Sequence, residues 1–159
     1  VDTPFTRNGK DYVVIDTAGL KKRGKIYEDI DRYAALRAFK AIERADIVLF
    51  VIDPIAGIRE QDKHVVGYAT EENKAIIIVV NKWDLLEKNN STSGEFVKKL
   101  RDEMGYLAFA PIIMTSAKTG QRVQKLLSLV DKVNDEFCKR IDTPTLQNGE
   151  SLRSEGCLR

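Results

Sequence analysis

The run AIIIVVNKWD, residues 75 to 84, constrains the fold of this chain more than any other stretch. Its first six residues are apolar and mostly β-branched, without the alternation of a strand that has one wet face. Such a run predicts a parallel strand covered by helices on both faces. Because ligands of open α/β sheets bind just beyond the carboxyl ends of the strands, we expect a ligand site at Asn81, Lys82 and Asp84.

Two further strands end in the same way, in a short turn of polar and small residues. They are YVVIDTAG, residues 12 to 19, and IIMTSAKTG, residues 112 to 120. Carboxyl ends of parallel strands meet at one edge of a sheet, so the three turns are expected to form one site. NKxD alone would occur by chance in roughly one chain in fifty of this length. Three such turns in succession make coincidence a poor explanation.

The residue types in these turns suit a guanine nucleotide. The Asp84 carboxylate offers two acceptors to the adjacent N1–H and amino donors of guanine, a pair that adenine lacks. Backbone amides around Ser116 and Ala117 can reach the guanine O6, while the Lys118 stem lies on the ring. Asp16 is placed to hold Mg²⁺ through water.

Together, DTAG, NKWD and SAKTG resemble the translation-factor-related GTPases, and residues 16 to 62 are similar to the second GTPase domain of the Der (EngA) family. The resemblance covers about residues 1 to 141. It implies a P-loop NTPase-type (Ras-like) α/β sandwich of three layers with a mostly parallel sheet. It also implies GTP or GDP, Mg²⁺ and a K⁺ ion as cofactors, and the large ribosomal subunit or its rRNA as partner.

The resemblance also assigns roles to residues. The contacts to the γ-phosphate and magnesium region are assigned to Asp16, Thr17, Ala18, Gly19 and Leu20. Guanine selection is assigned to Asn81, Lys82, Trp83 and Asp84, and completion of the base pocket to Ser116, Ala117 and Lys118. For Trp83, at the variable position of the motif, packing is the favoured role, because tryptophan is mostly a large apolar body.

A phosphate-binding loop of the form G-x-x-x-x-G-K-[ST] is absent from these 159 residues. The family places that loop, with the first strand and first helix, upstream of the position of Val1. We therefore expect the chain to be part of a longer one, and GTPase activity to belong to the intact domain. We also expect strands 11 to 15 and 46 to 53 to face a gap where the first strand would lie.

Hydrolysis is the least defined step. Many GTPases have a glutamine after DTAG to orient the attacking water, but this chain has Leu20, which cannot hydrogen-bond water. Another group or a bound cation must serve, and the resemblance implies K⁺. Two alternatives stay open: a tRNA-modification GTPase of the MnmE type, and an interaction fragment that does not hydrolyse GTP.

Composition and charge leave the partner undecided. Net charge is +2, so nucleic-acid binding cannot be argued from overall charge. The basic cluster at residues 21 to 25 is either a contact for rRNA or a solvated loop. Apolar runs are far shorter than the roughly 20 residues that span a bilayer, and we expect a cytoplasmic monomer. Cys138 is expected to fill a helix face, because two cysteines do not make a disulfide framework.

Periodicity predicts the remaining elements. The chain is expected to open with a hairpin that turns at Asn8 and Gly9. Parallel βαβ units then follow, with helices near residues 31 to 44, 59 to 72, 93 to 104 and 121 to 140, and strands at 46 to 53, 75 to 82 and 111 to 115. Residues 1 to 141 are expected to form a partial GTPase domain. Residues 142 to 159 are rich in Pro, Gly and Ser and are expected to be a disordered tail or linker.

Overall fold

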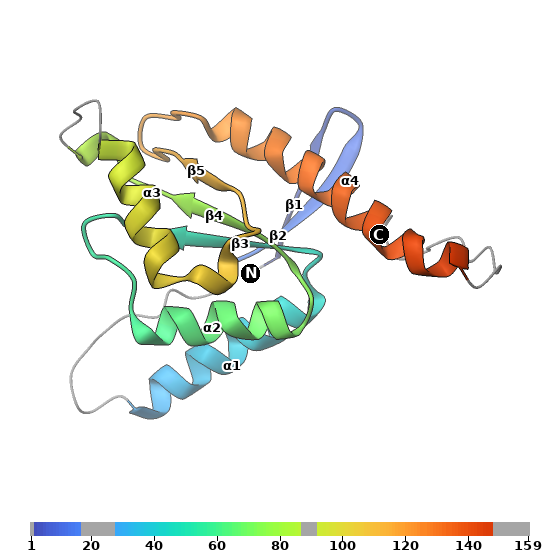
Figure 1. Ribbon diagram of the computed structural model, residues 1–159, viewed down its shortest axis with the longest axis horizontal. Helices are drawn as coiled ribbons and strands as arrows, with labels where there is room; N and C mark the ends of the chain where they lie inside the picture. The colour runs from blue at the N-terminus through green and yellow to red at the C-terminus, as the bar shows by residue number, and fades with distance from the viewer. Residues whose placement is uncertain (1, 17–27, 87–91, 148–159) are drawn as a thin grey trace.

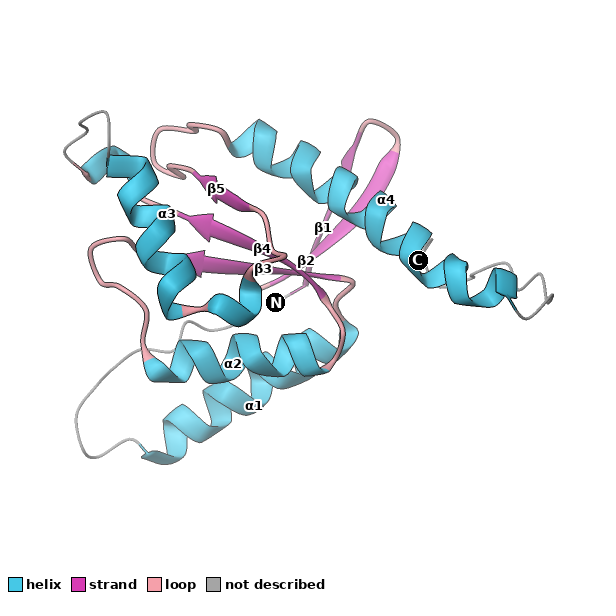
Figure 2. Cartoon of the chain, viewed as in Figure 1, coloured by secondary structure: helices cyan, strands magenta, loops and turns pink. Residues whose placement is uncertain are grey.

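The structure is a computed structural model that describes residues 2–16, 28–86 and 92–147 (Figure 1). Strands and helices alternate along most of the chain (Figure 2). The elements are β1 (Asp2–Arg7), β2 (Lys10–Ile15), α1 (Glu28–Arg44), β3 (Ile47–Ile52), α2 (Glu60–Glu71), β4 (Ala75–Val80), the 3-10 helix η1 (Trp83–Leu85), α3 (Thr92–Glu103), the 3-10 helix η2 (Gly105–Leu107), β5 (Ile112–Met114) and α4 (Val123–Gln147).

A parallel sheet of strand order β3-β4-β5 forms the centre of the molecule. Ile47 pairs with Ala75 at one side of β4, and Ile78 pairs with Ile112 at the other. All six residues of β4 are buried, as expected for a central strand covered on both faces. The strand predicted from the apolar run is therefore confirmed.

Helices cover the sheet from two sides. Side chains two residues apart on a strand share a face, and Ile76 and Ile78 of β4 belong to one buried cluster with Ile42 of α1, Val66 of α2 and Leu100 of α3. Figure 1 shows α4 on the other side of the sheet from α1 and α2, and α4 packs against β4. The molecule is therefore the three-layer α/β sandwich that the sequence predicts.

The first two strands form a separate antiparallel hairpin. Its turn is formed by Asn8 and Gly9, both with positive φ (52° and 76°), the conformation that a tight hairpin turn requires. The hairpin is tied to α4, because Arg7 Nη1 lies 2.9 Å from Asp131 Oδ2 and the Tyr12 hydroxyl donates to the other oxygen of Asp131. That hydrogen bond to the carboxylate raises the pKa of Tyr12.

Apolar side chains are exposed on the two strands that were expected to face a gap. On β2, Val13 and Val14 are 59% and 48% exposed, and on β3, Leu49 and Val51 are 40% and 58% exposed. Leu49 and Val51 lie on the face of β3 opposite to the buried cluster, since they alternate with its members. No strand pairing joins β2 to β3 within the described residues.

The last helix differs from the sequence-based expectation. We predicted its end near residue 140 and a disordered segment from Asp142, but α4 continues to Gln147 and passes through Pro144. The predicted end of the helix is therefore wrong, because helix propagation continues past the position where composition indicated a stop. The assignment of residues 142–159 to a tail or linker stays a prediction. Residues 148–159 lie outside the described part. Cys138 is disulfide-bonded, so its expected role as a free packing residue is also wrong.

Candidate functional site

The turn after β4 is fixed by backbone hydrogen bonds to both neighbouring strands. The Asn81 N–H donates to the Ile52 carbonyl (2.9 Å) at the end of β3, and the Trp83 N–H donates to the Thr115 carbonyl (3.0 Å) after β5. Between them Lys82 adopts the left-handed conformation, with φ of 57°. The NKWD segment is therefore clamped between the carboxyl ends of all three parallel strands.

The Asn81 side chain joins this turn to the turn after β5. Its Oδ1 accepts a hydrogen bond of 2.9 Å from the Ala117 N–H. Ser116 is fully buried, and its Oγ accepts from the Thr119 N–H (3.2 Å), which closes the second turn. Ala117 and Lys118 are exposed at the top of this turn. The structure thus brings together the two segments that were predicted to form the base pocket.

Trp83 and Asp84 begin the short η1 helix and have different surroundings. Trp83 is 5% exposed and packs edge-to-face on Phe96 of α3, with ring centroids 5.7 Å apart. The packing role predicted for Trp83 is confirmed. Asp84 is half-buried, and its Oδ1 is shielded from solvent. Removing water from a carboxylate costs free energy, and folding has already removed water from Asp84 Oδ1. A ligand with matched donors therefore gains more binding free energy from Asp84 than from a fully hydrated carboxylate.

The side chain of Lys82 connects this turn to the loop between β3 and α2. Its Nζ lies 2.7 Å from Oδ2 of Asp53, the residue that follows β3. The other oxygen of Asp53 accepts the backbone N–H of Ile55 at 2.9 Å. The hydrogen bond from Lys82, and next the one from Ile55, lower the pKa of Asp53 below its ordinary value.

The DTAG segment is only partly described. Asp16 is exposed and directly follows β2. Thr17, Ala18, Gly19 and Leu20 lie outside the described residues, as do the basic residues 21 to 25. Because β2 does not pair with β3 in the described structure, the sheet does not bring Asp16 to the other two turns. Its place in a common site stays a prediction.

A magnesium ion has few protein ligands to use in the described ranges. They hold no group of three or more His, Cys, Asp or Glu side chains that could bind a metal. Asp16 is one carboxylate, which agrees with the habit of Mg²⁺ of using one or two carboxylates together with waters and substrate phosphates. A role of Asp16 in holding Mg²⁺ stays a prediction.

Sequence reasoning missed Asp53 and Thr115 as parts of the site. Asp53 has the signal that singled out Asp16, an acidic residue at the end of an apolar strand, DIVLFVID. Thr115 acts through its backbone carbonyl, which the Trp83 N–H finds because β4 and β5 are neighbours. That contact depends on strand order, so residue identity gives no sign of it.

A family model for the elongation factor Tu GTP-binding domain matches residues 3–136. The chain belongs to this GTP-binding domain family. The match runs from the second residue of β1 into α4, so both turns of the candidate site lie inside it. The P-loop NTPase-type fold expected from the sequence is confirmed for this domain.

Curated relatives of the domain confirm the resemblance to the Der family. GTPase Der of Lactobacillus acidophilus is 53% identical over 148 residues, which are 93% of this chain and 34% of that protein. GTPase Der of a Geobacillus species is 54% identical over 146 residues, 92% of this chain and 34% of that protein. The chain therefore spans about a third of the length of the curated relatives it matches.

The fold also matches solved GTPase structures. Era in complex with MgGDPNP and nucleotides 1506–1542 of 16S ribosomal RNA superposes with a TM-score of 0.68. The two chains are 22% identical, and the match covers 83% of this chain and 43% of Era. At this identity the similarity supports the fold alone.

Proposed function

We propose that the protein binds guanine nucleotides at the NKWD and SAK turns and hydrolyses GTP as a switch in assembly of the large ribosomal subunit. The observation that carries the proposal is the hydrogen bond of 2.9 Å from the Ala117 N–H to Asn81 Oδ1, which joins the two turns into one unit. Family membership and the Der relatives support the same nucleotide.

Each turn contributes a different part of base recognition. Asp84 accepts from N1–H and the amino group of guanine, and a base without these donors leaves a desolvated carboxylate unmatched. Ser116 and Ala117 direct backbone N–H groups to the guanine O6. The stem of Lys118, which is exposed in the structure, packs on the ring. Adenine nucleotides are rejected because adenine has an acceptor at N1, a donor at position 6 and no amino group at position 2.

The phosphates and the metal depend on other segments. Asp16 holds Mg²⁺ through water, and Gly19 lets a backbone N–H approach the terminal phosphate. A bound Mg²⁺ would neutralise charge on the transferred phosphoryl group. With Leu20 in place of a water-orienting glutamine, intrinsic hydrolysis is slow and is faster in potassium than in sodium. Equal rates of GTP hydrolysis in potassium and sodium salts would refute the proposed role of K⁺.

Nucleotide identity is tested first, by calorimetric titration of the full-length gene product with GDP and with ADP in the presence of Mg²⁺. Sites are fitted separately where more than one is found. Micromolar GDP binding with no response to ADP is the expected result. Binding of neither nucleotide would favour the interaction domain without GTPase activity, and equal binding of both would contradict base selection by Asp84.

The ribosomal partner is tested by co-sedimentation with large ribosomal subunits. Because GTP orders the loops next to the phosphates in GTPases, we expect more protein in the subunit fraction with a non-hydrolysable GTP analogue than with GDP. Recovery in the subunit fraction that does not depend on the nucleotide would argue against a switch.

Because assembly of bacterial ribosomes takes place in the cytoplasm, the proposal includes a cytoplasmic location. Every helix in the described ranges is too short or too polar to span a bilayer.

A further inference from the structure

The contact between Lys82 and Asp53 has no role in the function proposed so far. The two residues are 29 positions apart, yet Lys82 Nζ and Asp53 Oδ2 are separated by only 2.7 Å. The pair connects the start of the β3–α2 loop to the middle of the NKWD turn. Both side chains are partly open to solvent, at 54% for Lys82 and 29% for Asp53. Ion pairs this exposed add little to overall stability, so a local role is the better explanation.

Asp53 is a fixed anchor and not a mobile acceptor. Its Oδ1 accepts the backbone N–H groups of Ile55 (2.9 Å) and Ala56 (3.4 Å). Its backbone carbonyl accepts the N–H of Gly57 at 3.0 Å, and Gly57 has a φ of 70° that suits glycine. Two hydrogen bonds therefore hold the carboxylate and a third holds the backbone of the same loop.

The backbone of Lys82 is left-handed, and the ion pair acts beside the backbone hydrogen bonds of Asn81 and Trp83 that hold this turn. At a φ of 57° a residue with a Cβ is disfavoured relative to the right-handed conformation. Residues held in this way persist only where the surroundings fix them, and they cluster at ligand sites. The conformation of Lys82 sets the direction in which the chain enters η1, and Asp84 lies two residues later.

We propose that Asp53 is a positioning residue for base specificity: through its ion pair with Lys82 it holds the left-handed turn that directs the Asp84 carboxylate toward the base. This inference rests on the proposed guanine site. Asp53 touches no ligand in this scheme and acts only through the turn. Its loss would therefore blur base selection without abolishing nucleotide binding.

The test is a double-mutant cycle of Asp53→Asn and Lys82→Met in the full-length gene product. Each variant is titrated with GDP and with IDP, whose base lacks the amino group that Asp84 reads. Each single variant is expected to weaken GDP binding about two- to fivefold and to lower the GDP-to-IDP preference by a similar factor. The double variant is expected to lose no more than Lys82→Met alone, because Asp53 acts only through Lys82, whatever Lys82 itself contributes at the base.

Glu60→Gln is the matched control. It removes an ion pair of the same length, from Lys63 Nζ to Glu60 Oε1 at 2.7 Å, on the outer side of α2. An equal effect of this control, additive losses for Asp53 and Lys82, or an unchanged GDP-to-IDP preference would each overturn the inference while leaving the guanine site intact. If Asp53→Asn does not fold, Asp53→Ser takes its place, since a serine hydroxyl can still accept the Ile55 N–H while the ion pair with Lys82 is lost. Failure of the unaltered protein to bind GDP would refute both proposals.

Discussion

Replacing Asn81 with alanine tests how the two turns are held together. The change removes Oδ1, the acceptor for the Ala117 N–H at 2.9 Å. A net hydrogen bond contributes about 0.5–1.5 kcal/mol, and leaving a buried partner unsatisfied costs more. Ala117 is exposed, so water can replace the lost acceptor, and the cost should lie near 1 kcal/mol. The second turn should therefore open more often while the sheet below it stays folded.

Amide hydrogen exchange measures this opening directly. Protection of the Ala117 amide should fall about fivefold, the equivalent of about 1 kcal/mol. The Trp83 amide, which donates to the Thr115 carbonyl, should keep its protection and serves as an internal reference. Asn81→Asp is the matched control because it retains an acceptor oxygen at the same position. Unchanged exchange at Ala117 in Asn81→Ala, or an equal loss at Trp83, would refute the view that one side chain links the turns.

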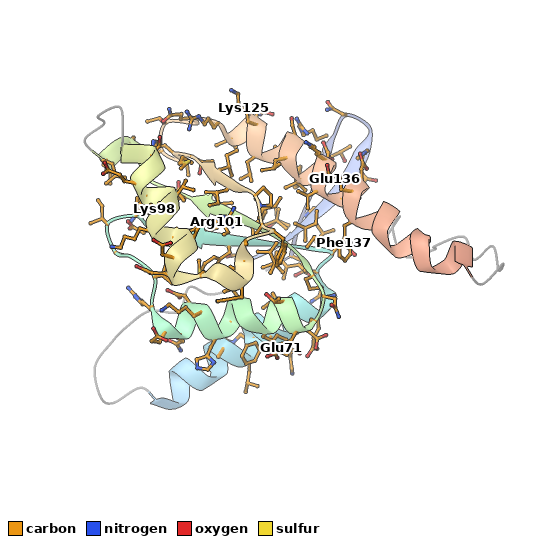
Figure 3. All side chains as sticks on the ribbon, viewed as in Figure 1. Glu71, Lys98, Arg101, Lys125, Glu136 and Phe137 are labelled. Carbon is orange, nitrogen blue, oxygen red and sulfur yellow. The ribbon has the colours of Figure 1, made fainter. Side chains whose placement is uncertain are left out.

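Three further predictions concern stability and ionisation. Ile78 is fully buried in β4, so Ile78→Ala should lower the free energy of unfolding in urea by about 2–5 kcal/mol, and a loss below about 1 kcal/mol would contradict its central place. Arg101, labelled in Figure 3, reaches from α3 to two carbonyls of the segment before β5, one at 2.6 Å. Arg101→Leu should cost about 1–3 kcal/mol in the same assay, whereas Lys98→Leu on the exposed side of α3 should change little. The hydrogen bond to Glu43 raises the pKa of Tyr68 from 10.0 to about 12, so its contribution to stability is complete below pH 10 and is lost as the pH rises through 12. An ultraviolet titration against Tyr68→Phe should show this phenol ionising near pH 12, and ionisation near pH 10 would disprove the contact.

Local patterns predicted most of the fold because the strands and helices have clear periodicity. The run at residues 75 to 80 could only be a covered strand, and the structure has all six residues buried. The hairpin turn at Asn8 and Gly9 was also readable, since its residue types suit positive φ. The end of helix α4 could not be predicted, because the composition near Pro144 indicated that the helix stops before it, whereas the backbone stays helical to Gln147.

Contacts between distant segments could not be predicted from residue patterns. The ion pair of Asp53 and Lys82 depends on β3 and β4 being neighbours in register. The hydrogen bonds of Arg7 and Tyr12 to Asp131 depend on where α4 crosses the hairpin. Sequence identifies such polar residues but leaves their partners open, because strand order and helix placement decide which of them meet.

The central claim is that Asp84 reads guanine, and exchanging its carboxylate for an amide tests it most directly. Asp84→Asn replaces an acceptor with a donor, which suits the carbonyl that xanthine carries in place of the guanine amino group. In calorimetric titrations of the full-length gene product, GDP affinity should fall by about a hundredfold or more, and XDP should become the preferred ligand. Unchanged GDP affinity at every site of the variant would exclude Asp84 from the base pocket and contradict the proposed function of this turn.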